Sequence, residues 1–252
     1  MADQVLVERF GPVLTITIDR PRVRNAVDRA AAIAAGLDRL DAEEGLVVGI
    51  LTGAGGTFCS GMDLKAFLTG ERPEVAGRGL VGLTETPPAR PLIAAVEGWA
   101  LAGGCEIALA CDLIVAADDA RFGLPEVRRG LVAGSGGLVR LPQRIPVQIA
   151  MELALTGAPL SAIDAHRWGL VNRLTPPGGA LEGARALAAE IAVNAPLAVQ
   201  LSKRILREAA EWPAAEVWSR QNPLVADVLA TDDAAEGARA FAEKRPAVWT
   251  GR

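Results

Sequence analysis

The segment ALAGGCEIALACD, residues 100–112, places a carboxylate one helical turn after a pair of glycines. The first N–H groups of a helix have no partner within it, so the N–H of Gly103 can point at a ligand. Residues three apart share a helix face, and Glu106 should therefore lie on the side of that donor. Apolar neighbours should raise the pKa of Glu106, as acid–base catalysis near neutral pH requires. The alternative is a Glu that only complements the helix dipole.

A second carboxylate, Glu126, follows Pro125 in FGLPEVRRG, residues 122–130. Proline is favoured in the first turn of a helix, so Glu126 is expected at a helix start, and by itself it could be no more than that. The helix and the returning strand before it could bring Glu126 back to the end of the core where Glu106 lies. Two carboxylates that face one small molecule can hold a water between them, one as base and one as acid.

A third candidate is the stretch LTGAGGTFCSGMDLKAF, residues 51–67. It predicts a buried strand that runs into a Gly-rich loop, with a helix starting around residues 60–63. Glycines let the backbone approach a ligand closely, and the N–H of Met62 is a candidate second donor. The spacing does not fit a dinucleotide-binding loop, because no helix directly follows GAGG. An ordinary Gly-rich turn is the alternative.

An α/β core must position these residues. Alternation of apolar and polar residues predicts an N-terminal hairpin that turns at Gly11-Pro12. Apolar runs predict strands over 46–53, 91–98 and 112–117. Helix signals predict an Ala-rich helix over 28–43, capped by Asp28, and a short helix over 103–110.

From about residue 134 the pattern becomes helical. Candidate helices cover 146–156, 180–193, 196–210, 214–230 and 232–243. We therefore divide the chain into a core with the site, residues 1–195, and a helical lobe, residues 196–252, that is expected to oligomerise.

Composition narrows the function classes. The 252 residues are 50% hydrophobic, which suits one large domain, and a net charge of −4 gives no strong field for nucleic acid or an acidic membrane. Three cysteines without a CxxC spacing and a single histidine argue against disulfides and against a metal centre. The N-terminus lacks a signal-peptide layout, and acids interrupt the apolar stretch 91–117. We expect a cytoplasmic protein without a membrane span.

The ordered set of segments resembles the crotonase, or enoyl-CoA hydratase/isomerase, superfamily across nearly the whole chain. The matching segments are PRVRNAV (21–27), FCSGMDLK (58–65), PLIAAVEGWALAGGCEIALACDLIVAADDARFGLPEV (91–127), AHRWGLVN (165–172) and FAEKRPAVW (241–249). SGMDLKAF and the closing segment look most like the branch of enoyl-CoA hydratases and carnitinyl-CoA dehydratase. One departure is Ala102, where the family often has a third glycine.

The resemblance implies a spiral of ββα units, shared with Clp-type proteases, whose C-terminal helices assemble trimers or dimers of trimers. It implies that Glu106 and Glu126 flank the double bond of an acyl-CoA thioester, and that the N–H groups of Met62 and Gly103 form an oxyanion hole. Coenzyme A would be part of the substrate, with no permanently bound cofactor and no metal. Its implied contacts are Arg22, Arg24, Ala26, Ser60, Gly61, Asp63, Leu64 and, from an adjacent subunit, Lys244.

We therefore expect an enoyl-CoA hydratase, which reversibly adds water to a 2-enoyl-CoA thioester. An isomerase needs chiefly the carboxylate at Glu126, and it remains an alternative, as does a carnitinyl-CoA dehydratase-like lyase. A serine peptidase of this fold is unsupported, because His166 is the only histidine for a triad and is expected to be structural. The glutamate pair disfavours a non-catalytic scaffold. Residues 66–90 are expected to shape the acyl pocket, and the acyl group is left open.

Overall fold

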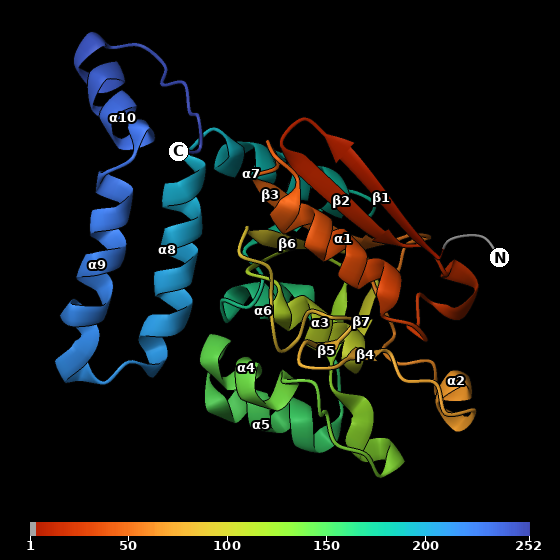
Figure 1. Ribbon diagram of the computed structural model, residues 1–252. Coiled ribbons are helices and arrows are strands. Elements are labelled where there is room, and N and C mark those ends of the chain that lie inside the picture. The colour runs from red at the N-terminus through yellow and green to blue at the C-terminus, as the bar shows by residue number, and fades with distance from the viewer. Residues whose placement is uncertain (1–3) are drawn as a thin grey trace.

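The computed structural model describes residues 4–252, and its centre is a six-stranded sheet in the order β1-β2-β3-β6-β8-β11 (Figure 1). The strands are β1 (Val5–Phe10), β2 (Val13–Ile18), β3 (Val48–Gly53), β6 (Leu92–Val96), β8 (Leu113–Ala117) and β11 (Arg173–Thr175). β1 and β2 pair antiparallel, which confirms the hairpin, and the other neighbours pair parallel. The three predicted apolar strands are also confirmed, each slightly shorter than expected.

Helices cover both faces of this sheet. On one face α7 (Ala180–Ala192) places Ala180, Ala184 and Ala188, one helical turn apart, against side chains of β3, β6 and β8. The other face packs on α1 (Ala31–Ala42) and continues into the larger core cluster around α3 (Gly103–Ala110). Parallel strands between two helical layers are buried on both sides, and this explains why they read as apolar runs.

A second, three-stranded sheet lies beside the first, in the order β10-β9-β7. Its strands are β7 (Trp99–Leu101), β9 (Arg121–Gly123) and β10 (Leu160–Ser161). The chain passes from the main sheet into this one and back, through β6, β7 and α3 and then through β8 and β9. This is the expected spiral of ββα units. The short strands were not predicted, because two or three residues show no period.

The start of α1 corrects one expectation. The helix begins at Ala31 with Ala30 as its N-cap, not at the predicted cap Asp28. The carboxylate of Asp28 instead forms an ion pair with Arg20, at 2.8 Å from its Nη2. Asp28 lies three residues before Ala31, too early in the chain to occupy the N-cap position, and no side chain caps this helix.

The remaining elements are mostly helical. They are α2 (Leu64–Leu68), α4 (Gly137–Arg144), α5 (Val147–Thr156), α6 (Ala162–Arg167), the 3₁₀ helices η1 (Pro21–Val23), η2 (Pro125–Arg129), η3 (Ala209–Glu211) and η4 (Ala214–Glu216), and a small hairpin of β4 (Glu74–Val75) and β5 (Gly79–Leu80).

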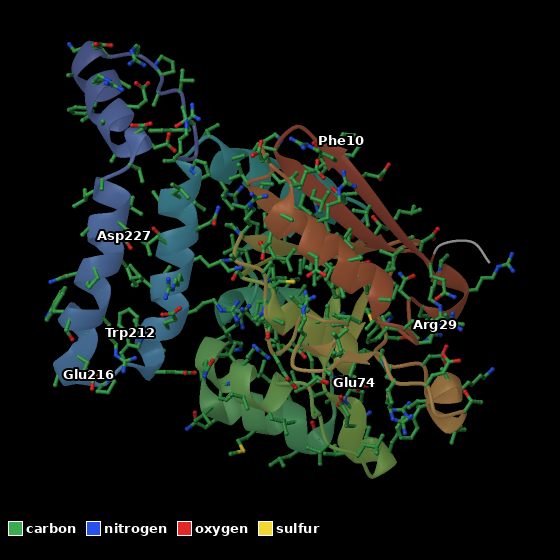
Figure 2. All side chains as sticks on the ribbon, viewed as in Figure 1. Phe10, Arg29, Glu74, Trp212, Glu216 and Asp227 are labelled. Carbon is green, nitrogen blue, oxygen red and sulfur yellow. The ribbon has the colours of Figure 1, made fainter. Side chains whose placement is uncertain are left out.

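Three helices stand beside the body of the molecule, as Figure 1 shows: α8 (Pro196–Glu208), α9 (Val217–Leu229) and α10 (Asp232–Glu243). In Figure 2, Trp212 and Glu216 mark the connection from α8 to α9, and Asp227 lies farther along α9. The single helix expected over 214–230 is split, because η4 precedes α9. Among residues 4–252, no helix has both the length and the apolar character needed to cross a bilayer.

Candidate active site

Glu106 lies in the first turns of α3 and is only 3% exposed. One carboxylate oxygen, Oε1, accepts hydrogen bonds from the backbone N–H of Ser135, at 2.7 Å, and from that of Gly137, at 2.9 Å. Burial raises the pKa of Glu106, while these two donors and the positive charge of Arg140 oppose that rise. The carboxylate is therefore fixed by one oxygen, and its other oxygen is left for the cavity that Glu106 lines.

Glu126 is held differently. It lies in the first turn of η2, after Pro125, in a 3₁₀ helix that begins two residues beyond the end of β9. Its Oε2 is buried and accepts no hydrogen bond within residues 4–252. Burial is the largest cause that raises the pKa of Glu126, and the charge of Glu106 raises it further. A buried carboxyl oxygen without a partner suits a group that awaits a substrate or a water.

Both carboxylates line one cavity of about 700 Å³. The other predicted site residues in its wall are Arg24, Ala26, Ser60, Met62, Asp63, Leu64 and Gly103. The segments that supply them lie far apart in the sequence and are brought together by the sheet, by α2 and by α3. The structure therefore gathers most of the predicted residues around a single space.

Three predicted contacts do not line this cavity: Arg22, Gly61 and Lys244. Arg22 is an exposed residue of η1, and Gly61 packs closely against the backbone of Leu101 and Gly103. Lys244 ends α10, which in Figure 1 lies apart from α2 and α3. Within one chain, Lys244 is not part of this site.

The backbones of Met62 and Gly103 approach one another at the cavity. A Cβ built on Gly103 would lie 3.6 Å from the Met62 nitrogen, and one built on Gly61 would lie 3.1 Å from the Gly103 nitrogen. No backbone hydrogen bond described for the loops of residues 4–252 uses the N–H of Met62 or of Gly103. Gly103 is also the first residue of α3, where an N–H has no partner within the helix. Two adjacent donors can together bind one oxyanion.

Backbone geometry just before α3 is unusual. Ala102 has φ +51 and ψ −129, a backbone conformation that residues other than glycine rarely adopt. The conformation is fixed on both sides, because the Ala102 N–H donates to the Gly123 carbonyl at 2.9 Å and the Ala102 carbonyl accepts from the Glu106 N–H at 3.1 Å. The alanine that departs from the family pattern is thus accommodated at a strained position, a cost of about 1–3 kcal/mol.

The backbone donors that hold Glu106 were not predicted from the sequence. In the structure, the N–H groups of Ser135 and Gly137 lie just before and at the start of α4, and both donate to Glu106. A glycine-rich turn before a helix is itself the signal of available N–H donors, so the sequence did contain it.

The other reactive side chains are structural. His166 places Nδ1 2.8 Å from the Val171 carbonyl oxygen and does not line the cavity. Burial raises the pKa of Cys59, Cys105 and Cys111 to about 12 in each case, so these thiols are not activated as nucleophiles. Residues 4–252 contain no group of three or more side chains placed to bind a metal ion.

Comparison with known proteins agrees with this architecture. A family model described as enoyl-CoA hydratase/isomerase matches residues 8–252. A carnitinyl-CoA dehydratase of Salmonella typhi is 44% identical over 100% of both chains. The crystal structure of an enoyl-CoA hydratase from Mycobacterium marinum is 59% identical and covers 99% of both chains with a TM-score of 0.97. That of a carnitinyl-CoA hydratase from Mycobacterium avium is 44% identical and covers 100% of both, with a TM-score of 0.79.

Proposed function

The chain belongs to the enoyl-CoA hydratase/isomerase family and has its crotonase fold, and we propose that it adds water to, and removes it from, a 2-enoyl-CoA thioester. The observation that carries this proposal is the pair Glu106 and Glu126 in one cavity with two adjacent backbone donors. An isomerase needs one carboxylate that moves a proton. A second carboxylate, fixed in place by two N–H groups, supports a reaction that also activates water.

The polarised group is the thioester carbonyl. Its oxygen accepts from the N–H groups of Met62 and Gly103, which stabilise the enolate that forms when water adds to the β carbon. Each aimed donor contributes about 3 kcal/mol to the transition state. The donors belong to the backbone and are already in place, so little reorganisation accompanies the reaction.

The two carboxylates divide the proton transfers. Two N–H donors and Arg140 favour the ionised form of Glu106, which takes a proton from the water as its oxygen bonds to the β carbon. Glu126 has no hydrogen bond to its buried oxygen and lies near the charge of Glu106, which favours its protonated form. Glu126 then gives its proton to the α carbon as the enolate collapses. Dehydration follows the same steps in reverse.

Coenzyme A enters as part of the substrate. Arg24, Ala26, Ser60 and Leu64 line the cavity on the side of η1 and α2, and they are the proposed contacts with its nucleotide and pantetheine portions. Trimers or dimers of trimers, built with the C-terminal helices, would allow Lys244 to reach the coenzyme of a neighbouring subunit. Equilibrium sedimentation tests this assembly, and a monomer would remove the role proposed for Lys244.

A carnitinyl-CoA dehydratase-like lyase is the second candidate. It is supported by the 44% identity over the full length of the Salmonella typhi enzyme and by Glu74 and Glu85, two carboxylates in the cavity wall that suit a cationic acyl group. Figure 2 labels Glu74. Quaternary ammonium groups also favour open aromatic faces. Among residues 4–252, Phe67 is the only aromatic residue in the cavity wall, and Arg72 already stacks on its ring at 4.0 Å. We therefore favour a neutral enoyl group over a cationic one as the acyl part of the substrate.

The proposal is tested by the ultraviolet absorbance of crotonyl-CoA, which falls when the conjugated double bond is hydrated. Wild-type protein should consume the enoyl thioester, and Glu106→Gln and Glu126→Gln should each lower kcat by about 10²–10⁴-fold. Glu152→Gln, an exposed glutamate on α5, is the matched control and should retain activity. Loss with Glu126→Gln alone would instead favour isomerisation.

A further inference from the structure

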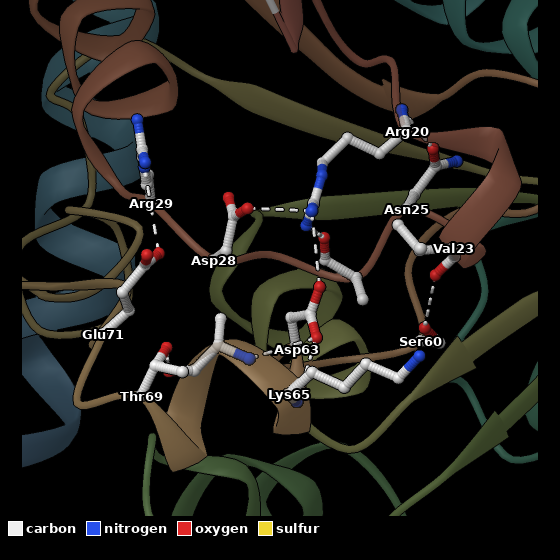
Figure 3. Close-up of polar contacts among 12 residues, drawn as sticks. Arg20, Val23, Asn25, Asp28, Arg29, Ser60, Asp63, Lys65, Thr69 and Glu71 are labelled. Atoms are coloured by element: carbon white, nitrogen blue, oxygen red, sulfur yellow. Dashed lines mark hydrogen bonds and ion pairs between the residues drawn. The ribbon is translucent and has the colours of Figure 1, made fainter.

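The guanidinium of Arg20 joins two segments that the proposed site needs. Arg20 follows β2, and its side chain is 15% exposed. Its Nη1 donates to the Ala26 carbonyl, and its Nη2 lies 2.8 Å from Asp28 Oδ2 and 3.3 Å from Asp63 Oδ2. Figure 3 shows the two ion pairs with Asp28 and Asp63. Ala26 and Asp28 belong to the segment after η1. Asp63 belongs to the loop before α2, directly after Met62 in the chain.

Arg20 is itself held at its backbone. Its N–H donates to Oδ1 of Asn25, at 2.8 Å. Asn25 is fully buried, and its Nδ2 donates to the carbonyls of Ala54, at 2.8 Å, and Thr57, at 2.6 Å. Because these hydrogen bonds hold the Arg20 backbone in place, they also restrict where its guanidinium can lie.

Met62 lies next to Asp63 in the chain, and it is bridged to Val27, the residue between Ala26 and Asp28. The Val27 N–H donates to the Gly61 carbonyl at 2.8 Å, and the Asp63 N–H donates to the Val27 carbonyl at 2.8 Å. In this parallel bridge the Met62 N–H points away from Val27, toward the side where Gly103 lies. The direction of the proposed donor therefore depends on how closely the two segments stay together.

The guanidinium of Arg20 balances the negative charge of two carboxylates, so its loss should be costly. The side chains of Asp28 and Asp63 are only 13% and 17% exposed, and both meet the same guanidinium nitrogen. Removal of Arg20 would leave two poorly solvated carboxylates without their shared counter-charge, and their repulsion would separate the segments. A lysine would restore one positive charge but not the planar fork that reaches a carbonyl and two carboxylates.

We infer that Arg20 is a positioning residue for the Met62 N–H and ties the segment proposed to bind coenzyme A to the oxyanion hole. The inference rests on the proposed function, because that function assigns the donor its role. Arg20 does not line the cavity, so it acts through Met62 and not on the substrate.

The test compares Arg20→Lys and Arg20→Met on crotonyl-CoA and on crotonyl-pantetheine, which lacks the nucleotide. A displaced donor should lower kcat by about 10–100-fold, by the same factor with both thioesters and with less effect on KM. Arg20→Lys should lose less than Arg20→Met. The matched control is Arg29→Lys, also drawn in Figure 3, whose exposed side chain lies 3.8 Å from Glu71. It should leave kcat unchanged.

Asp63→Asn is a milder second variant, which tests the same contact if the Arg20 variants fail to fold. Asparagine can still accept from the N–H groups of Lys65 and Ala66 as the N-cap of α2, so the helix keeps its start while the charge that meets Arg20 is lost. We expect a smaller loss of kcat in the same direction. An unchanged kcat in folded Arg20 variants would overturn the inference. So would a loss confined to crotonyl-CoA, because Arg20 would then serve the coenzyme alone.

A readout without turnover separates this inference from the proposed function. Acetoacetyl-CoA forms an enolate with its own ultraviolet absorbance, and an oxyanion hole should raise the enolate fraction of the bound ligand. Arg20→Met should lower that fraction and Arg29→Lys should not. If wild-type protein hydrates no enoyl thioester, the hydration proposal fails while this comparison still tests Arg20. Equal enolate fractions in the wild type and Arg20→Met would overturn the role of Arg20.

Discussion

Glu106 and Glu126 are the same residue type in one cavity, and the structure gives them different surroundings. Glu106 is almost completely buried and is compensated by two N–H donors and by a nearby arginine. Glu126 is only partly buried, and one of its oxygens has no partner within residues 4–252. Environments that treat two like carboxyls differently allow one to act as base and the other as acid.

Arg140 gives a prediction for the pH profile. Arg140 from α4 lowers the pKa of Glu106, and the charge of Glu106 raises the pKa of Glu126 from η2. Burial raises the pKa of Glu106, and Arg140 lowers it, so Arg140→Met should raise it further. In the proposed mechanism Glu106 acts in its ionised form, which is lost as pH falls through its pKa. The acidic limb of kcat/KM against pH should therefore move to higher pH.

A control for this shift lies on the same helix. Arg144 is half-buried on the same helix, and it donates to the Cys111 carbonyl at 2.6 Å, away from Glu106. Arg144→Met should lower stability without moving the acidic limb. An acidic limb that stays in place in Arg140→Met, or one that moves equally in both variants, would contradict the role given to Arg140.

The starts of α3 and α4 determine the geometry of the site. α3 supplies Gly103 and Glu106, and the turn before α4 supplies two N–H groups that hold the Glu106 carboxylate. The sequence predicted the bounds of α3 because two glycines precede a short stretch, CEIALA, that is apolar apart from Glu106. It did not predict that the turn before α4 meets α3, since that contact depends on tertiary packing and not on local pattern.

Gly137→Ala tests the contact between these two helix starts. A Cβ at residue 137 would lie 2.9 Å from Cγ and 3.2 Å from Oε1 of Glu106. The carboxylate must therefore shift, and we expect kcat to fall by about 100-fold, the cost of a catalytic group displaced by roughly 1 Å. Kinetics with crotonyl-CoA provide the measurement. Gly237→Ala on α10, where the added carbon meets only the ring of Trp249 at 3.5 Å, should retain activity; loss in both variants would contradict the explanation.

At the scale of the whole molecule, the α/β class, the main strands and the C-terminal helices were predictable from apolar runs and helix signals. The strands of the second sheet were not, because they are two or three residues long and are held by pairing with distant segments. Resemblance to a known family, more than periodicity, predicted that Glu106, Glu126, Met62 and Gly103 meet. The division of the chain at residue 195 and the assembly into trimers remain predictions.

A largely buried ion pair helps to connect α8 to the sheet, beside a longer one from Arg207 to the same Asp112. Lys203 of α8 lies 2.6 Å from Asp112, just before β8, and donates to the Arg90 carbonyl at 2.8 Å. Lys203→Met would leave Asp112 with less compensation, and we expect a loss of about 3 kcal/mol in the free energy of unfolding. Urea denaturation measures it. The matched variant is Arg204→Met, which breaks an exposed pair with Glu208 and should cost less than about 1 kcal/mol. Equal losses would contradict a special role for Lys203.

The proposed hydration by two carboxylates puts the oxygen of water on the β carbon and a solvent proton on the α carbon of the CoA thioester. Product analysis after reaction of crotonyl-CoA in water labelled with heavy oxygen and deuterium tests this outcome. We predict one heavy oxygen on the β carbon and one deuterium on the α carbon, with both lost in Glu106→Gln and in Glu126→Gln. Deuterium in the recovered thioester without heavy oxygen, and unaffected by Glu106→Gln, would contradict hydration and would instead indicate proton transfer by Glu126 alone.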